Sequence, residues 1–337
     1  MRFVALLALA LLLVAIGGSQ AREHRGPQRG MVLLGWKSDT YLGPRSDAAL
    51  RRAAADGSDH VAIFSQWFIA NTSDSLLAPD PTRTPTDASI LHAMATARAL
   101  GMEVTLKPQV AIRSGAWIGA AQPSDLEGFW RRYTAMLLRY ADLAQRGGAS
   151  TLVVGTEMTK LSGDAPRWRA LIAAVRLHFH GTLTYAANYD EYRRVPFWDA
   201  LDYIGIDAYF PLADPADPAP PAQQLAAAWS GRGYLNAIAA LSRRTGRQVL
   251  FTEIGYRAIH TAAVHPSSWQ ARAATDTGAQ ANAYEAFYTA VAGQPWMAGV
   301  YWWAVDPDPT PLQDYDPTGK PAEVIVAREN VRAMLPW

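Results

Sequence analysis

Eight short apolar runs recur along the chain, each separated from the next by a longer segment of mixed polarity. Most of the runs are apolar at consecutive positions rather than at alternate ones, which is typical of parallel strands covered on both faces. We therefore interpret them as eight buried strands. Their ranges are 31–36, 60–64, 102–107, 151–156, 182–187, 202–207, 248–252 and 299–303.

The intervening segments carry helix-period patterns of apolar residues. Helices are predicted at 46–56, 87–100, 124–146, 166–179, 222–245, 278–292 and 322–334, with a single turn around 195–200. Strands that alternate with helices eight times predict an α/β fold, a single (β/α)8 TIM barrel. The alternative is a doubly wound open sheet. It is disfavoured because neither a Gly-x-Gly-x-x-Gly pattern nor a P-loop pattern follows the first strand.

The chain begins with an early Arg, an apolar run from Phe3 to Ile16, and the small residues Ser19 and Ala21. This order predicts a secretory signal peptide at 1–21, and hence a secreted or periplasmic protein with no stable membrane insertion after cleavage. An uncleaved anchor is the alternative, although the run is short for a membrane span. We expect a flexible lead-in at 22–30 and one catalytic barrel at 31–337.

Composition excludes several classes of function. The net charge is +1, so no electrostatic pattern favours nucleic acid or another acidic polymer as partner. The chain has no Cys, which rules out disulfides and thiol chemistry. Its twelve Trp are more abundant than a core needs and are typical of proteins that stack on flat ligand faces. The sequence leaves the oligomeric state open.

Two glutamates come directly after predicted strands, Glu157 after the fourth and Glu253 after the seventh. In a barrel of this type the carboxyl ends of the strands form the active site, and these two strands lie across its mouth. A pair of carboxyl groups flanking a glycosidic bond is what glycoside hydrolysis requires. A separation of about 5–5.5 Å gives retention, and a wider one gives inversion. Either glutamate alone fits a helix cap or an ion pair equally well.

Other catalytic chemistries lack their residues. The seven His do not gather at strand ends, so we predict no metal site. His260 and His265 fall in the loop after the seventh strand, where a contact with substrate is possible. A Ser-His-Asp triad lacks its Gly-x-Ser-x-Gly turn. The two glutamates remain the candidates.

Four segments together resemble glycoside hydrolase family 113, the β-mannanases, within clan A of the (β/α)8 retaining glycosidases. They are VVGTEM, NYDEYRRVPFWDALDYIGIDAYFPL, VLFTEIGYRA and VYWWAVDP, and the resemblance spans roughly 30–335. It implies that Glu157 is the acid/base and Glu253 the nucleophile of a two-glutamate double displacement. It also implies a polysaccharide or oligosaccharide of β-1,4-linked mannose as substrate, net retention, and no cofactor.

One position departs from the wider clan, where Asn commonly precedes the acid/base and binds the sugar 2-OH. Here it is Thr156, so we expect Asn188 to supply that contact. Tyr209 is expected to donate to Glu253, or else to pack on the rim. Trp303 is expected to form the platform beneath the reacting sugar, while Trp302 packs outward. Further candidates, each with a structural alternative, are the platforms Trp36, Trp67 and Trp117 and the hydroxyl ligands or interior ion partners Lys107, Gln109 and Asp207.

Three functional hypotheses follow. The first is a secreted retaining hydrolase of β-1,4-mannosidic linkages. The second keeps the enzyme but changes the sugar to a β-glucan or another exported polysaccharide. The third is a non-catalytic carbohydrate-binding barrel, which the presence of both Glu157 and Glu253 argues against. A likeness of fold alone does not separate the first two.

Overall fold

The computed structural model describes residues 26–334 of the 337-residue chain. The predicted signal peptide at 1–21 and the first part of the predicted lead-in lie outside these residues. Within the described part, no helix combines the length and the apolar character that crossing a membrane requires.

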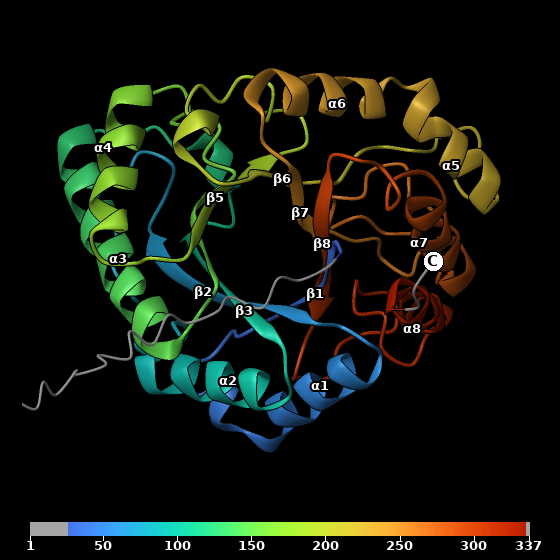
Figure 1. The fold of residues 1–337 in the computed structure, drawn as a ribbon, viewed down its shortest axis with the longest axis horizontal. Coiled ribbons are helices and arrows are strands. Elements are labelled where there is room, and N and C mark those ends of the chain that lie inside the picture. Colours follow the sequence, from blue (N-terminus) through green and yellow to red (C-terminus); the bar gives the residue numbers. More distant parts are fainter. Residues whose placement is uncertain (1–25, 335–337) are drawn as a thin grey trace, which may run out of the picture.

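Eight parallel strands close into a barrel in which each strand pairs with its neighbours in chain order and β8 returns to β1 (Figure 1). This confirms the predicted TIM barrel. The strands are β1 (Gln28–Leu33), β2 (His60–Ile69), β3 (Glu103–Ile112), β4 (Thr151–Thr156), β5 (Thr182–Asn188), β6 (Ile204–Asp207), β7 (Val249–Ile254) and β8 (Met297–Val305).

Helices surround the barrel and cover the outer face of the strands (Figure 1). They are α1 (Pro44–Ala55), α2 (Asp87–Ala99), α3 (Leu126–Gly147), α4 (Ala165–Arg176), α5 (Ala222–Gly231), α6 (Tyr234–Thr245), α7 (Thr277–Ala290) and α8 (Pro321–Met334). The connection between β5 and β6 holds only the 3-10 turn η3 (Trp198–Ala200), as predicted. Two further 3-10 turns, η1 (Thr40–Leu42) and η2 (Ile118–Ala120), lie in loops.

Several predicted boundaries were wrong. The strands predicted at 60–64 and 102–107 extend five residues further, to Ile69 and Ile112. The single helix expected at 222–245 is divided into α5 and α6 at Gly233, whose φ of 78° interrupts the helical backbone at a residue without a Cβ. The lead-in expected at 22–30 overlaps β1, because Gln28 already pairs with Gly299 of β8 and Arg29 forms an ion pair with Asp59. The barrel therefore begins three residues earlier than the apolar run at 31–36 indicated.

The apolar residues form two cores. The larger lies between the strands and the helices, and Trp302 illustrates it, stacked on Tyr284 of α7 at 3.8 Å between ring centroids. The smaller fills the inside of the barrel with residues such as Val32, Phe64 and Leu250. Trp302 thus packs outward as predicted.

Candidate active site

A cleft of about 1,000 Å³ opens at the carboxyl ends of the strands. Both predicted glutamates line it, together with residues from the loops that follow the strands. The lining residues are Leu34, Trp36, Arg83, Gln109, Trp117, Thr156, Glu157, Asn188, Tyr189, Asp190, Tyr209, Glu253, Arg257, Ser267, Trp269, Trp303, Asp306, Pro311, Asp314 and Tyr315. This is the position at which barrels of this type carry their active sites.

Irregular strand pairing precedes each glutamate. Between β6 and β7 the register moves from Ile206 opposite Phe251 to Asp207 opposite Glu253, so β7 contains one extra residue. Between β4 and β5 the register shifts in the same way just before Glu157. Such bulges change the direction in which the following side chain points. Glu157 itself has a φ of 50°, a left-handed conformation that is costly for a residue with a Cβ.

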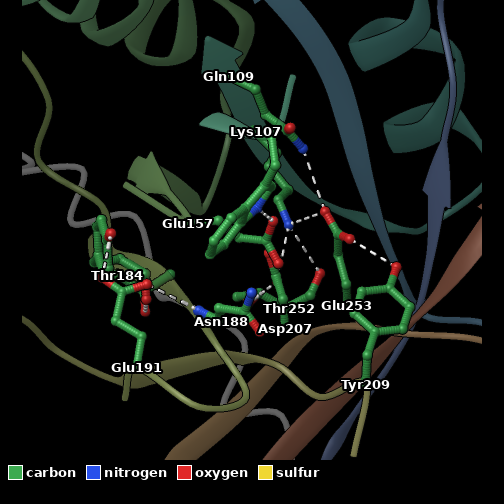
Figure 2. Close-up of polar contacts among 12 residues, drawn as sticks. Lys107, Gln109, Glu157, Thr184, Asn188, Glu191, Asp207, Tyr209, Thr252 and Glu253 are labelled. Carbon is green, nitrogen blue, oxygen red and sulfur yellow. Dashed lines mark hydrogen bonds and ion pairs between the residues drawn. The ribbon is translucent and has the colours of Figure 1, made fainter. Parts of the chain in front are cut away.

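The Glu253 carboxylate accepts hydrogen bonds from three side chains (Figure 2). Lys107 Nζ lies 2.5 Å from Oε1, and Gln109 Nε2 donates to the same oxygen over 3.2 Å. Tyr209 donates its hydroxyl proton to Oε2 over 2.8 Å. The donor role expected of Tyr209 matches this geometry. Both oxygens of Glu253 are therefore fixed, with a cation beside one of them.

Lys107 and Asp207 lie inside the barrel beneath the cleft. Both are fully buried, and Lys107 Nζ is 3.1 Å from Asp207 Oδ1. Thr252 donates to the same oxygen over 2.7 Å. Neither Lys107 nor Asp207 lines the cleft, so of the two roles expected for them the interior ion partner fits and the hydroxyl ligand does not. Both side chains lie inside the barrel below the rim, where Lys107 pairs with the carboxylates of Asp207 and Glu253.

Burial raises the pKa of Glu253 to about 7, and the charge of Asp207 adds to the rise, while Lys107 and Tyr209 oppose it. Burial alone would lower the pKa of Lys107, but the carboxylates of Asp207 and Glu253 outweigh it and raise that pKa instead. The lysine thus stays charged at neutral pH. Its charge favours the ionised form of Glu253 over that of any neighbouring carboxyl without a cation.

Glu157 has a different environment. Among residues 26–334 its carboxylate has one hydrogen-bond donor, Trp117 Nε1, at 2.6 Å from Oε2. Burial raises its pKa well above the ordinary value, and the charges of Asp207 and Glu253 raise it further. Because Lys107 lies beside Glu253 and not beside Glu157, the arrangement favours a charge on Glu253 and a proton on Glu157. Two carboxyl groups with divided protonation are what an acid and a nucleophile require.

Aromatic side chains form much of the cleft surface. Trp303 and Trp36 both line it, and Phe64 supports them from inside the barrel, with ring centroids 6.0 Å and 5.0 Å from theirs. Trp36 Nε1 also donates to Asp306 over 2.9 Å. Together with Trp117, these residues present flat apolar faces of the kind on which pyranose rings stack.

Trp67 was wrongly predicted as a platform. It does not line the cleft and instead packs outward, 6.4 Å from the ring of Tyr140 on α3. Its neighbour Ser65 bonds the Tyr140 hydroxyl on the same outer face, since positions two apart on a strand share a face. The tryptophan therefore belongs to the core between β2 and α3.

Two buried oxygens of the cleft have no hydrogen-bond partner within the described chain. They are Thr156 Oγ1, next to Glu157, and Asn188 Oδ1, at the end of β5. Both residues line the cleft. Buried polar groups are rarely left without a partner, so these atoms are suited to receive hydroxyl groups of a ligand. The expectation for Asn188 is consistent with this position.

The sequence analysis did not assign several cleft residues, and all of them lie in loops. Arg83 follows β2, Arg257 and Trp269 follow β7, and Asp314 and Tyr315 follow β8. Loop residues carry no periodicity that would direct them to one side of the barrel. Only the abundance of Trp in the chain pointed to residues such as Trp269. His260 bonds Asp276 outside the cleft, so substrate contact from it is not supported.

No cluster of three or more His, Asp or Glu side chains within residues 26–334 is arranged to hold a metal ion. What the cleft offers is a pair of carboxyl groups, aromatic faces and unpaired oxygens. These groups suit proton transfer and nucleophilic attack at a sugar.

Comparisons with known proteins agree with this chemistry. The family model described as Glycoside Hydrolase Family 113 matches residues 33–315. A GH113 β-mannanase from Alicyclobacillus acidocaldarius, in complex with ManMIm, is 28% identical, with a TM-score of 0.82 over 91% of this chain and 98% of that one. Another GH113 β-1,4-mannanase is 23% identical, with a TM-score of 0.82 over 91% and 99%. The search of curated proteins returned no match.

Proposed function

Because the chain belongs to glycoside hydrolase family 113 and is a glycoside hydrolase, we propose that it cleaves β-1,4-mannosidic linkages with retention of configuration. The observation that carries the proposal is the contrast between its two cleft carboxyl groups. Within residues 26–334, Glu253 has a lysine, a phenol and an amide as donors, whereas Glu157 has an indole alone. This contrast supports Glu253 as nucleophile and Glu157 as acid/base.

In the first step, the Glu253 carboxylate attacks the anomeric carbon while Glu157 gives its proton to the glycosidic oxygen. The bond between the anomeric carbon and that oxygen breaks, the shortened chain leaves as an alcohol, and the sugar is bound to Glu253 as an ester. Tyr209 and Lys107 hold the Glu253 oxygens for this attack.

In the second step, Glu157 is a carboxylate and takes a proton from a water molecule. The water oxygen attacks the anomeric carbon, the ester bond to Glu253 breaks, and both carboxyl groups return to their starting protonation. Two inversions at the same carbon give net retention. The residue that donated the first proton therefore also accepts the second.

The cleft surface supports sugar binding next to these groups. Trp303 provides the platform for the reacting ring, and Trp36 and Trp117 extend the aromatic surface. Asn188 Oδ1 and Thr156 Oγ1 accept from sugar hydroxyl groups, Asn188 taking the 2-OH. The relative from Alicyclobacillus acidocaldarius is a β-mannanase, which favours mannose as the sugar.

Hydrolysis of mannan, glucomannan and cellulose oligosaccharides by the wild type and by Glu253→Ala tests the proposal. We expect cleavage of manno-oligosaccharides by the wild type and a loss on the order of 10⁴-fold or more in kcat/KM in the variant. Cleavage that survives in Glu253→Ala contradicts the nucleophile assignment. Activity on glucans alone contradicts the substrate and not the mechanism.

We further propose that the protein is exported and cleaved after Ala21, because the segment 1–21 has the order of a signal peptide. N-terminal sequencing of the protein recovered from outside the cytoplasm is expected to begin at Arg22. Recovery of a membrane-bound chain that still begins at Met1 would establish the uncleaved anchor instead.

A further inference from the structure

A second cavity adjoins the active-site cleft at the loop between β7 and α7. Its volume is about 520 Å³, and its lining residues are Arg257, Trp269, Gln270, Ala271 and Arg272. Arg257 and Trp269 line the main cleft as well, so the two spaces adjoin at these side chains. All lining residues of the second cavity belong to the loop between β7 and α7.

Trp269 is 64% exposed, and no aromatic ring among the described residues packs against it. It therefore contributes little to the core, although an exposed indole is unfavourable in water. Arg257 beside it is half-buried, donates to the carbonyl of Ala271, and pairs with no carboxylate among residues 26–334. An aromatic face next to guanidinium and amide donors suits a pyranose. The aromatic ring stacks on the face of the sugar, and the donors bind its hydroxyl groups by hydrogen bonds.

We propose that Trp269, Arg257, Gln270 and Arg272 form a distal subsite for a pyranose unit of the polysaccharide, away from the bond that is cut. The subsite rests on the proposed function for the identity of the sugar. With this subsite the protein binds long oligosaccharides more tightly than short ones. Its affinity for an oligosaccharide rises with the number of sugar units until the subsite is occupied.

Binding of a manno-oligosaccharide series of increasing length tests the subsite, measured by calorimetry in the inactive Glu253→Gln background. We expect the affinity to rise with length, and Trp269→Ala to remove that rise, which weakens the longest ligand about tenfold. The shortest ligand is expected to bind equally well to both. The matched control is Leu177→Ala, which removes an 81% exposed apolar side chain at the end of α4 and leaves the rise intact.

An unchanged dependence on length in Trp269→Ala overturns the subsite. The same series is given to the wild type and its products are analysed. Oligosaccharides that bind with the predicted length dependence but are not cleaved contradict the proposed function and leave the subsite standing. Cleavage without any gain in affinity from length contradicts the subsite alone.

A separate observation concerns Glu191, in the turn after β5. Its side chain is fully buried, and no cation among the described residues pairs with it. Its carboxylate instead accepts from Tyr185 OH at 2.8 Å and from Thr159 Oγ1 at 3.0 Å. It also accepts from the backbone N–H of Asn188 at 3.1 Å (Figure 2). Burying a carboxylate without a cation costs free energy, and hydrogen bonds of this kind offset that cost.

These contacts surround the acid/base. Thr159 is two residues after Glu157, and Tyr185 OH also accepts from the amide of Met158, the next residue, at 2.8 Å. Glu157 has the left-handed φ of 50°, which persists only where the surroundings impose it. The Glu191 carboxylate thus joins the segment after Glu157 to the end of β5.

From this network we also infer that Glu191 is a positioning residue, which holds Glu157 in the orientation for proton transfer to the leaving group. It touches neither substrate nor the reacting atoms and acts through the backbone at 157–159. Its loss therefore slows the first step, which kcat/KM reports, only for substrates whose leaving group needs a proton.

Leaving-group dependence of kcat/KM tests this role, with glycosides of the sugar that the wild type cleaves. Glu191→Gln keeps the side-chain volume but replaces one carboxylate oxygen with an NH2 group. That group cannot accept the hydrogen bonds that Tyr185 or Thr159 donates. We expect kcat/KM for an unactivated oligosaccharide to fall about tenfold, while the 2,4-dinitrophenyl glycoside reacts at the wild-type rate. Tyr185→Phe is expected to act in the same direction.

The matched control is Thr105→Val, which removes a buried hydrogen bond to Tyr301 and leaves the Glu157 network untouched. It is expected to leave both substrates unaffected. Equal losses on both substrates in Glu191→Gln would mean a purely structural residue and overturn the inference, as would no loss on either. Failure of mannosides as substrates would not affect the comparison, since it uses the sugar actually cleaved.

Discussion

On one side of the cleft, β3, β6 and β7 surround Glu253 with a lysine, a phenol and an amide, and place a second carboxylate, Asp207, on the same lysine. On the other side, β4 presents Glu157 on a left-handed backbone with one indole as donor. Both glutamates lie next to a register shift between strands, and Glu253 is buried while Glu157 is half-buried. They differ in the charges and donors that face them.

The difference shows how one barrel prepares two chemically identical side chains for opposite tasks. The cation beside Glu253 favours its ionised form, and the absence of a facing cation leaves Glu157 protonated. Catalysis requires Glu253 ionised and Glu157 protonated, so kcat/KM is expected to rise as Glu253 loses its proton near pH 7. It is expected to fall again at higher pH, when Glu157 loses its own.

The largest expected effect comes from removing the acid. Glu157→Gln cannot protonate the leaving group, so kcat/KM for manno-oligosaccharides is expected to fall on the order of 10³-fold. The alkaline limb of the pH profile is expected to disappear with it. A 2,4-dinitrophenyl mannoside, whose leaving group needs no proton, is expected to lose far less. Equal loss on both substrates would contradict the acid assignment.

Lys107→Met removes the charge that distinguishes the two sides. It leaves Asp207 and Glu253 buried without a cation, and we expect unfolding in urea to require about 3–5 kcal/mol less free energy. The pKa of Glu253 rises when the cation is lost, so the acidic limb of kcat/KM is expected to move upward by about one to two pH units.

The matched control for this variant is Lys160→Met, the same change at an exposed lysine. It is expected to alter neither the stability nor the limb. An acidic limb that stays in place in Lys107→Met would show that the lysine does not control the ionisation of Glu253.

Tyr209→Phe removes one donor to Glu253 but keeps Lys107. The lost hydrogen bond to a charged group corresponds to a fall of about tenfold in kcat/KM, with a smaller upward shift of the acidic limb than in Lys107→Met. Tyr284→Phe is the control, because its hydroxyl is buried outside the barrel without a partner in the described chain. A limb that moves downward instead would contradict the donor role.

Trp117→Phe is expected to have the smallest effect and tests the hydrogen bond to Glu157. The indole favours the ionised form of Glu157, so its removal is expected to raise the pKa of that carboxyl and move the alkaline limb to higher pH. The phenyl ring keeps an aromatic face, so kcat/KM at neutral pH is expected to change by only about twofold. The full pH profile of kcat/KM measures it, and a shift to lower pH would contradict the contact.

The barrel and the positions of Glu157 and Glu253 could be predicted because they depend on local patterns. Consecutive apolar runs identify buried parallel strands, and the end of a strand identifies the rim. The outward packing of Trp302 followed from the alternation of side chains along β8. The same argument applied to β2 would have predicted that Trp67, next to the inward Gln66, packs outward as well.

Other features depend on contacts between distant segments. Lys107 and Asp207 are 100 residues apart in the chain. Their depth below the rim depends on the register of the barrel strands, which cannot be read from the sequence. The buried network of Glu191 arises in the same way, because it joins the segment after β4, at 158–159, to the end of β5 and the turn that follows it, at 185–191. The loop that carries Trp269 has no period at all, so its approach to the cleft required the structure.

The central claim is that Glu253 forms the covalent bond to the sugar. The most direct test is to trap the intermediate with 2-deoxy-2-fluoro-β-mannosyl fluoride, whose fluorine at C2 slows the second step, and to locate the label by peptide mass spectrometry. The account predicts one 2-deoxy-2-fluoromannosyl group on the peptide that contains Glu253. Activity is expected to be lost at the same rate as the label appears. A label on the peptide of Glu157, or inversion of configuration in the product, would contradict it.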